Sequence, residues 1–502
     1  MSERRNNAAS GDPLLELLSS VKDAESRKQC RMYADLYRII IGKGDDLVQN
    51  VKESIPTNEE KLQNSDPLHL LELGELLLYR GDIPGYRKVI QSLNNMSLKT
   101  LLFVGGDPLF VRNRLAILEA MENGFPESIH QTLELVRKFP RGAEETNEAL
   151  KNLACTLVEC IHISGMEERI LPELLAVLKK ISRKDLRGDA TALVARKLCM
   201  RAENTPTTNH GLIEFARNEL LPGINDVVER DFTEVQLAIA EMKHSQMAND
   251  DRRDEFRSRS ENAFSDLEKK LARRISEEQR ILLNFNLIRG LVQAGLYERS
   301  RALKNKLIRD FERELESTMD TLEMIEETRK RFNGHLPAEL REMEQQLVEM
   351  TDGTFAVSCG CLILAARFSP DGELASEYLR EAQRMLNMIP FMYTRYQLLL
   401  QLGGSFSFRH DPSLADQALK YAGDITKAVP RKDGLQLFRG ELTDWFGESY
   451  FFEPRQSLID LYTDLAAELR VGRRDLDKCI VNLMASIYSY ARSQKWKIAF
   501  NE

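Results

Sequence analysis

The sequence is poor in the residues that interrupt helices. Its 502 residues include only 27 glycines and 16 prolines. Sheet proteins need turn residues every few positions, whereas long helices joined by short turns need few. The scarcity argues against a sheet-rich fold and favours an all-α protein.

Signals for a membrane or a secretory route are also missing. No run approaches 18 apolar residues, and residues 1–11 form a polar tail without the pattern of a signal segment. The formal net charge of -8 disfavours unspecific attraction to nucleic acid or to anionic lipid. We therefore expect a cytoplasmic protein that does not bind membranes and for which nucleic acid is an unfavoured partner.

Known signatures of cofactor or metal sites are absent. The seven cysteines follow neither a disulfide framework nor a zinc pattern, so we interpret them as reduced thiols in helices. They are Cys30, Cys155, Cys160, Cys199, Cys359, Cys361 and Cys479. Neither G-x-x-x-x-G-K-[ST] nor G-x-G-x-x-G occurs. The sequence therefore predicts no cofactor and no catalytic residue.

Short Gly/Pro breaks recur along the first half of the chain. They fall at Gly81, Gly124, Gly165 and around Pro206, about 40 residues apart, and each separates two stretches with apolar residues at helical spacing. Helix pairs that repeat in this way bury their apolar faces by stacking side by side. The period predicts an α-solenoid of antiparallel helix pairs.

Changes in composition divide the chain into five parts. We expect a flexible tail at 1–11, helical repeats at 12–223, long charged helices at 224–333, further repeats with an aromatic loop at 334–453, and capping helices at 454–502. In the third part, Phe311, Leu315, Thr318, Leu322, Ile325, Arg329 and Phe332 alternate in steps of four and three. This coiled-coil-like pattern favours an antiparallel hairpin or small bundle, for which residues 256–275 offer a facing stripe.

Two patches resemble tetratricopeptide repeats. One consists of Leu70, Leu73, Gly74, Leu77, Gly81, Ile90 and Leu93; the other consists of Ile288, Leu291, Gly295, Tyr297, Ser300 and Leu307. The longer spacing of the N-terminal breaks is more similar to HEAT or armadillo repeats. The chain thus resembles a divergent helical-repeat protein, a fold that implies binding of other macromolecules.

The motif Glu-x-x-His occurs three times, as Glu127/His130, Glu159/His162 and Glu241/His244. On a helix this spacing places a carboxylate and an imidazole on one face, as di-iron carboxylate proteins require. The first two pairs lie at different distances from the turn near residue 141, and the offset of about 15 Å is too large for a shared metal. A metal-dependent helical enzyme is therefore kept only as an alternative.

Two clusters are candidates for partner binding. Six aromatic residues lie within fifteen positions: Phe438, Trp445, Phe446, Tyr450, Phe451 and Phe452. They can form either an aromatic anchor for a partner or a core plug between the last helices and the repeats. A basic patch consists of Lys179, Lys180, Arg183, Lys184 and Arg187. Its positive charges either complement the dipole at a helix C-terminus or bind a partner, which would be RNA or an acidic protein.

These observations favour a non-catalytic scaffold or adaptor that binds partner proteins on a helical-repeat surface. Residues 224–333 offer a second surface for a partner or for self-association. A metal-dependent enzyme and a helical-repeat RNA-binding protein are the alternatives.

Overall fold

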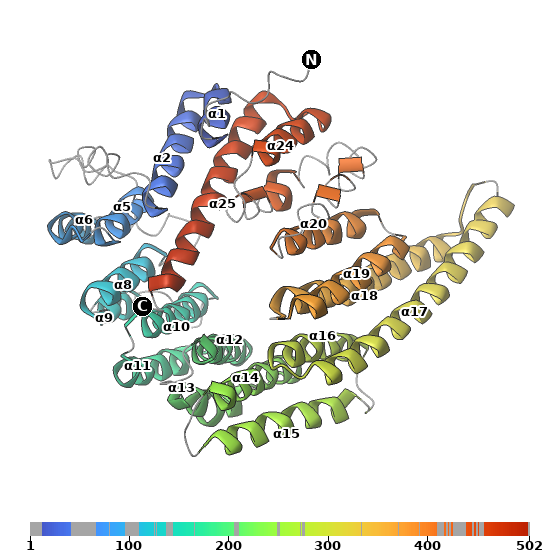
Figure 1. The fold of residues 1–502 in the computed structure, drawn as a ribbon, viewed down its shortest axis with the longest axis horizontal. Helices are drawn as coiled ribbons and strands as arrows, with labels where there is room; N and C mark the ends of the chain where they lie inside the picture. The colour runs from blue at the N-terminus through green and yellow to red at the C-terminus, as the bar shows by residue number, and fades with distance from the viewer. Residues whose placement is uncertain are drawn as a thin grey trace. The chain divides into compact units, whose positions relative to one another are not determined.

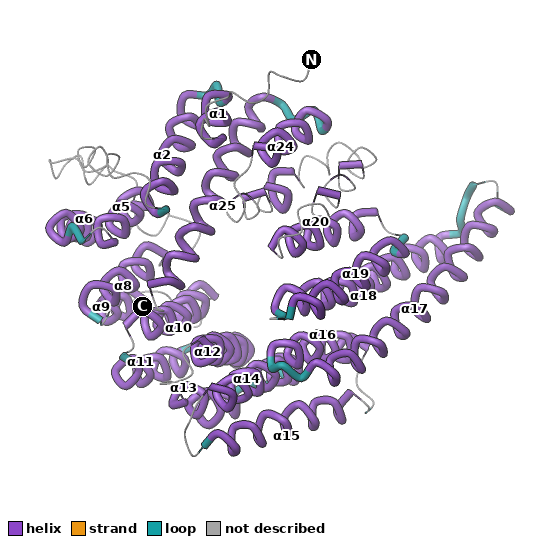
Figure 2. The backbone as a smooth tube through the Cα atoms, viewed as in Figure 1, coloured by secondary structure: helices purple, strands orange, loops and turns teal. Residues whose placement is uncertain are grey.

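The chain folds into helices. A computed structural model describes residues 13–41, 67–95, 110–136, 144–247, 252–408 and 438–499, apart from short gaps within these ranges, and a few positions between 416 and 424. Over these residues there is no β-strand (Figure 2). The predicted all-α class is confirmed. Two compact units contain the chain: unit 1 is Met1–Ala34 with Phe264–Ala491, and unit 2 is Asp35–Ala263 with Arg492–Glu502.

Unit 2 consists of helix pairs in sequence order (Figure 1). Its helices are α5 (Pro67–Tyr79), α6 (Ile83–Asn95), α8 (Phe110–Asn123), α9 (Ser128–Val136), α10 (Glu144–Ser164), α11 (Glu167–Lys180), α12 (Lys184–Asn204), α13 (His210–Phe215) and α14 (Val227–Met247), with a π-helical turn at Ala216–Leu220. The helix α2 (Ala24–Ile40) and the helix α15 (Arg253–Leu271) each contribute residues to both units.

The first helix of each pair packs against the first helix of the next. The helices α5, α8, α10, α12 and α14 contact one another in this order, and α6, α9, α11 and α13 each pack against the preceding first helix. We call the five the first-helix row. A row of stacked two-helix units is the arrangement of an α-solenoid, so this prediction is confirmed within unit 2.

Glycine closes two of the predicted turns. Gly81 has φ of 70° and Gly124 has φ of 79°, values that glycine adopts without strain. At the first turn, the N–H of Gly81 donates to Leu78 O and the N–H of Asp82 donates to Leu77 O, which is a Schellman cap. Gly165 and Pro206, the other two breaks, lie outside the described residues.

The patch that resembles a tetratricopeptide repeat forms the pair α5 and α6. Leu70, Leu73, Leu77 and Leu93 are buried in its core, together with Tyr86. These side chains are the apolar faces that the spacing predicts. The second patch forms the pair α16 and α17 of unit 1, described next.

Unit 1 repeats the pairing. Its helices include α16 (Glu277–Gln293), α17 (Tyr297–Arg331), α18 (Ala338–Phe368), α19 (Gly372–Met388), α20 (Met392–Phe408), α24 (Gln456–Glu468) and α25 (Arg473–Ala499, shared at its end with unit 2). The helix α16 packs on α17 and α18, and α18 packs on α19 and α20. Gly295, with φ of 76°, joins α16 to α17 through the same cap as Gly81.

The longest helices, α17 and α18, form an antiparallel hairpin. Phe311 contacts Phe355 with ring centroids 5.1 Å apart, and Arg329 donates two bonds of 2.8 Å to Glu344. The facing stripe for α17 thus comes from α18, not from residues 256–275 as the sequence suggested. The short turn after Arg331 makes the next helix the antiparallel neighbour. Glu344 also explains why Arg329 is tolerated in a seam whose other members, apart from Thr318, are apolar.

The helix α18 has one notable property. Between Ala338 and Arg367 it is long and apolar enough to cross a membrane, and half of the apolar window is buried. A buried core helix passes the same test, and α18 packs against α16, α17, α19 and α20. It is therefore weak support for a membrane span.

The first helices of the chain pack against the last ones inside unit 1. The helix α1 (Pro13–Ser20) contacts α24. Asp477 of α25 accepts hydrogen bonds from the backbone N–H groups of Lys22 and Asp23, at 3.2 and 2.9 Å. Tyr33 of α2 contacts Tyr488 of α25, with ring centroids 6.0 Å apart. Segments about 455 residues apart thus share one core.

Candidate functional site

Polar contacts join neighbouring helices of the first-helix row. Arg114 of α8 forms an ion pair with Glu75 of α5, and both side chains are largely buried. Lys197 Nζ of α12 lies 3.0 Å from Glu159 Oε1 of α10, and both side chains are about one-third exposed. The partners lie 39 and 38 residues apart in sequence. These distances match the repeat period, because each contact spans one helix pair.

The same contacts continue from α12 to α14. Arg196 pairs with Glu229, and Glu203 accepts hydrogen bonds from Gln236 and from Lys243, the latter at 2.9 Å. These partners are 33 to 40 residues apart. We call the nine residues of these two paragraphs the polar ladder. Lys197, Glu159, Glu229 and Lys243 are partly exposed and leave hydrogen-bonding capacity at the surface of the row, whereas Arg114, Glu75 and Glu203 are largely buried.

A buried carboxylate lies on α14, the last helix of this row. Glu241 of α14 is fully buried; its Oε1 accepts a hydrogen bond from Arg217 Nε at 2.9 Å and forms an ion pair with Arg217 Nη2 at 2.7 Å. His244, one turn later, is also buried and packs edge-on against Phe256, with ring centroids 4.6 Å apart. Arg217 comes from the π-helical turn Ala216–Leu220, which presents it to α14.

The neighbouring carboxylate Glu214 differs in its electrostatics. Burial raises the pKa of the Glu241 carboxyl to about 7, although Arg217 opposes the rise. Burial also acts on Glu214, but the bond that Arg259 Nη1 donates at 2.6 Å and the charge of Arg259 outweigh it and lower the pKa of Glu214. The two carboxyls therefore differ in protonation near neutral pH.

Among the described side chains, the three Glu-x-x-His motifs are not brought together. Glu127 lies outside the described residues, and His130 is exposed on α9. Glu159 belongs to the polar ladder, and the side chain of His162 is not among those described. Within the described part of the chain, no three His, Cys, Asp or Glu side chains are placed to hold a metal ion. Nothing here supports the metal-dependent alternative.

The seven cysteines are free thiols, and all except the half-buried Cys155 are buried. Burial raises the pKa of Cys30 and of Cys359 to about 12. A thiol with such a pKa is protonated at neutral pH and is a poor nucleophile. These cysteines pack in the core as small apolar side chains.

The basic patch lies at the C-terminus of α11 and the start of α12. Its members are Lys179, Lys180, Arg183, Lys184 and Arg187. Arg187 donates to Ile181 O at 2.8 Å, and Arg183 pairs with Asp185. Two of the five cations are therefore engaged in local contacts, whereas Lys179, Lys180 and Lys184 are exposed. The lysines in the last turn of α11 complement its dipole.

The aromatic cluster is partly described. Phe438, Phe446 and Tyr450 are buried, while Trp445, Phe451 and Phe452 lie outside the described residues. Phe438 and Phe446 pack on the ring of Tyr462, with centroids 4.8 and 5.1 Å away. The three described rings thus belong to the core near α24 and do not reach the surface as an anchor.

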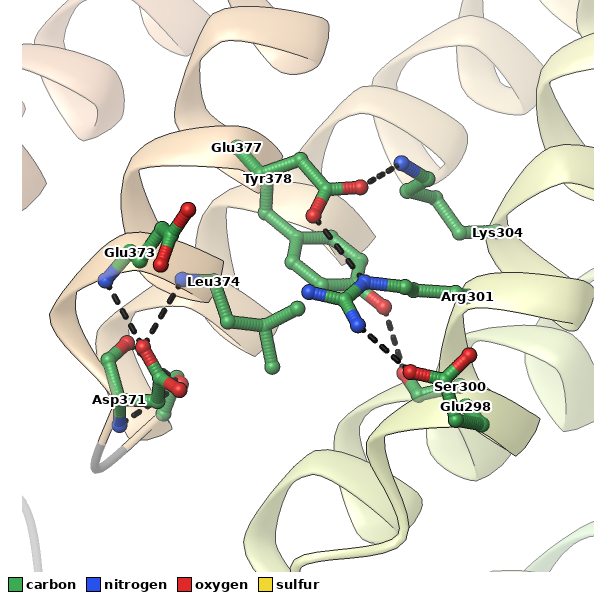
Figure 3. A network of polar contacts seen from close by, with 10 residues as sticks. Glu298, Ser300, Arg301, Lys304, Asp371, Glu373, Leu374, Glu377 and Tyr378 are labelled. Atoms are coloured by element: carbon green, nitrogen blue, oxygen red, sulfur yellow. Dashed lines mark hydrogen bonds and ion pairs between the residues drawn. The ribbon is translucent and has the colours of Figure 1, made fainter.

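A polar network holds the base of the α17–α18 hairpin to α19 (Figure 3). Ser300 Oγ and Tyr378 Oη are 2.6 Å apart, and both side chains are buried. Glu377 pairs with Lys304 and, at 3.2 Å, with Arg301. The network joins the start of α17 firmly to a neighbouring helix.

The far end of the hairpin extends beyond these neighbours. At 1.5 Å per residue, the 35 residues of α17 span about 52 Å, and the 17 residues of α16 span about 25 Å. Most side chains of residues 312–347 are exposed or half-buried. The sequence pattern identifies the face of α17 that packs on another helix, but it does not show how far the hairpin extends. The spacing of apolar residues on α17 carries no information about the lengths of the neighbouring helices. We call residues 312–347 the distal hairpin.

Comparisons with known proteins give little beyond this geometry. No family model matches the chain, and no curated protein matches it. A solved structure described as a circular tandem repeat protein with novel repeat topology and enhanced subunit contact surfaces is similar over 87% of this chain and 98% of that chain. Its sequence identity is 17% and the TM-score is 0.26, so the fold assignment rests on the helix contacts above.

Proposed function

We propose that the chain is a non-catalytic scaffold that binds partner proteins on the surface of the first-helix row. The observation that carries this proposal is the row itself. Five helices stack in sequence order, and polar contacts about one repeat apart join α5 to α8, α10 to α12 and α12 to α14. Stacked helices of this kind present an extended surface rather than a closed pocket.

The polar ladder is the part of the row best suited to recognition. Lys197 and Lys243 are about one-third and one-quarter exposed, so their ammonium groups lie at the surface while their partners fix them. A partner segment carrying carboxylates can share these cations without displacing the helices. Charged groups held in place in this way contribute specificity more than affinity.

The test is quantitative cross-linking and affinity purification from the native organism, with the wild-type chain and three variants. Lys197→Glu and Lys243→Glu reverse cations on the first-helix row, and Lys88→Glu reverses an exposed cation on α6 in the same unit. We expect partners cross-linked to the row to be reduced by the first two changes only.

Cross-links confined to the second helices, or equal losses with Lys88→Glu, would contradict the proposal. Stoichiometric iron, manganese or zinc that is lost on replacing His130 or His162 would instead favour the enzyme alternative. A salt-sensitive complex with RNA that disappears when the basic patch is neutralised would favour the RNA-binding alternative.

A further inference from the structure

The distal hairpin has an outward face with a regular pattern. On α17, Glu316, Asp320, Glu323, Glu327 and Lys330 recur in steps of four and three, and all five are exposed. The seam that packs on α18 has the same steps, but its members lie on the opposite side of the helix. The outward stripe is therefore a second, unpartnered face along the same helix.

Charge is distributed unevenly along this face. Between positions 312 and 327 the helix carries Glu312, Glu314, Glu316, Asp320, Glu323, Glu326 and Glu327, with Arg313 as the single cation. The last turn of α17 is basic and consists of Arg329, Lys330 and Arg331. The distal hairpin thus has an acidic shaft and a basic tip.

Apolar side chains accompany the charges. Met319 and Met324 are 48% and 52% exposed, and they flank the outward stripe, one turn after Glu316 and Asp320 respectively. They are two of the seven large apolar side chains found exposed in the described residues. Phe332, which is 57% exposed, follows the last residue of α17 and belongs to the seam pattern. Exposed apolar groups rimmed by charge are typical of protein interaction surfaces.

We propose that two copies of this chain associate through the outward faces of their distal hairpins, in antiparallel orientation. With a two-fold axis beside Met324, the axial position of Lys330 in one copy falls opposite position 318 of the other. Along the helix axis, Lys330 and Arg331 then lie between Glu316 and Asp320 of the second copy, and the two Met324 side chains flank the two-fold axis.

The charge pattern selects this orientation. The centre of the acidic stripe and the basic tip are separated by about ten residues, or about 15 Å. An antiparallel pair brings opposite charges together twice, once at each end of a two-fold symmetric contact. A parallel pair places acid against acid and base against base. Glu327, which would face acidic residues near the axis, has Arg331 of its own helix at 3.7 Å.

The projection makes the contact accessible to a second copy. The distal hairpin extends about 27 Å beyond the length of α16. The network around Ser300, Tyr378 and Glu377 fixes the hairpin base, so little conformational entropy is lost when the tips associate. The contact uses α17 of unit 1, and it is independent of the partner surface on the first-helix row.

Sedimentation equilibrium of the full chain tests the proposal through a charge exchange. The tip variant is Lys330→Glu with Arg331→Glu, and the shaft variant is Glu316→Lys with Asp320→Lys. Each variant alone places like charges together, and we expect its dimer dissociation constant to rise about tenfold or more. An equimolar mixture of the two variants pairs opposite charges at both ends and should restore the dimer.

Lys179→Glu with Lys180→Glu is the matched control, because it reverses two adjacent exposed cations in the last turn of α11. We expect it to dimerise as the wild type does. Unchanged far-ultraviolet circular dichroism and melting temperature establish that each variant is folded. A wild type that stays monomeric at all concentrations overturns the proposal. A tip variant that dimerises like the wild type, or a mixture that stays monomeric, does the same.

Discussion

Replacing Glu241 by glutamine should change how the stability of unit 2 depends on pH. The carboxyl is fully buried, and its pKa is raised from the usual 4.5 to about 7. A raised pKa means that the folded chain binds this proton more tightly than the unfolded chain does. The contribution to stability is complete below about pH 4.5 and is lost as the pH rises through about 7.

The magnitude follows from the two pKa values. A difference of one pKa unit corresponds to about 1.4 kcal/mol, so the rise from 4.5 to about 7 corresponds to roughly 3 kcal/mol. Glutamine keeps a carbonyl oxygen that can accept the bonds from Arg217, but it does not ionise. Between about pH 4.5 and about pH 8, the unfolding free energy of the wild type should therefore fall by about 3 kcal/mol more than that of Glu241→Gln.

Urea unfolding followed by circular dichroism, with hydrogen exchange of the α14 amides as a local readout, measures this difference. Glu214→Gln is a control of opposite sign. The lowered pKa of Glu214 gives stability that is present above its unfolded pKa and is lost as the pH falls, so its replacement should matter most at neutral pH. If the unfolding free energies of the wild type and of Glu241→Gln changed equally with pH, the raised pKa of the Glu241 carboxyl would be contradicted.

Three further substitutions test the packing by thermal and urea denaturation. Arg470 has φ of 50°, so Arg470→Gly should raise the unfolding free energy of unit 1 by about 0.5–1 kcal/mol. At Gly447 an added Cβ would lie 2.4 Å from Ser486 Oγ, so Gly447→Ala should lower it by about 1–3 kcal/mol. Arg114→Met removes the cation beside the buried Glu75 carboxylate and should cost unit 2 about 3 kcal/mol.

Each of these changes has a matched control. Arg470→Ala keeps a Cβ at positive φ and should give no gain. At Gly440 an added Cβ meets nothing within 4 Å, so Gly440→Ala should be tolerated. Adding Glu75→Gln to Arg114→Met removes the buried charge and should recover part of the loss. Equal effects of Gly440→Ala and Gly447→Ala would contradict the close approach of Ser486 to Gly447.

Much of the helix pairing was predictable because glycine and apolar spacing act locally. Gly81 and Gly124 turn the chain where the sequence indicates, and their positive φ values explain why glycine is needed there. Residues 454–502, which the sequence predicts to be helical, contain α24 and α25. In each case a few neighbouring residues determine the structure.

Contacts between distant segments were not predictable in the same way. Lys197 and Glu159 carry opposite charges one repeat apart, which is a signal that a search at the repeat period would find. With 29% of the residues charged, however, many pairs satisfy that spacing by chance. The burial of Phe438 and Phe446 depends on Tyr462, whose position is set by the tertiary fold.

The bonds from Lys22 and Asp23 to Asp477 have a consequence for biosynthesis. Asp477 leaves the ribosome about 455 residues after Lys22, a delay of roughly 20–90 s at about 5–20 residues per second. Residues 35–263, which form nearly all of unit 2, emerge during this interval and can fold first. The N-terminal helices must wait with apolar faces uncovered, so this nascent segment is where a chaperone would be needed most.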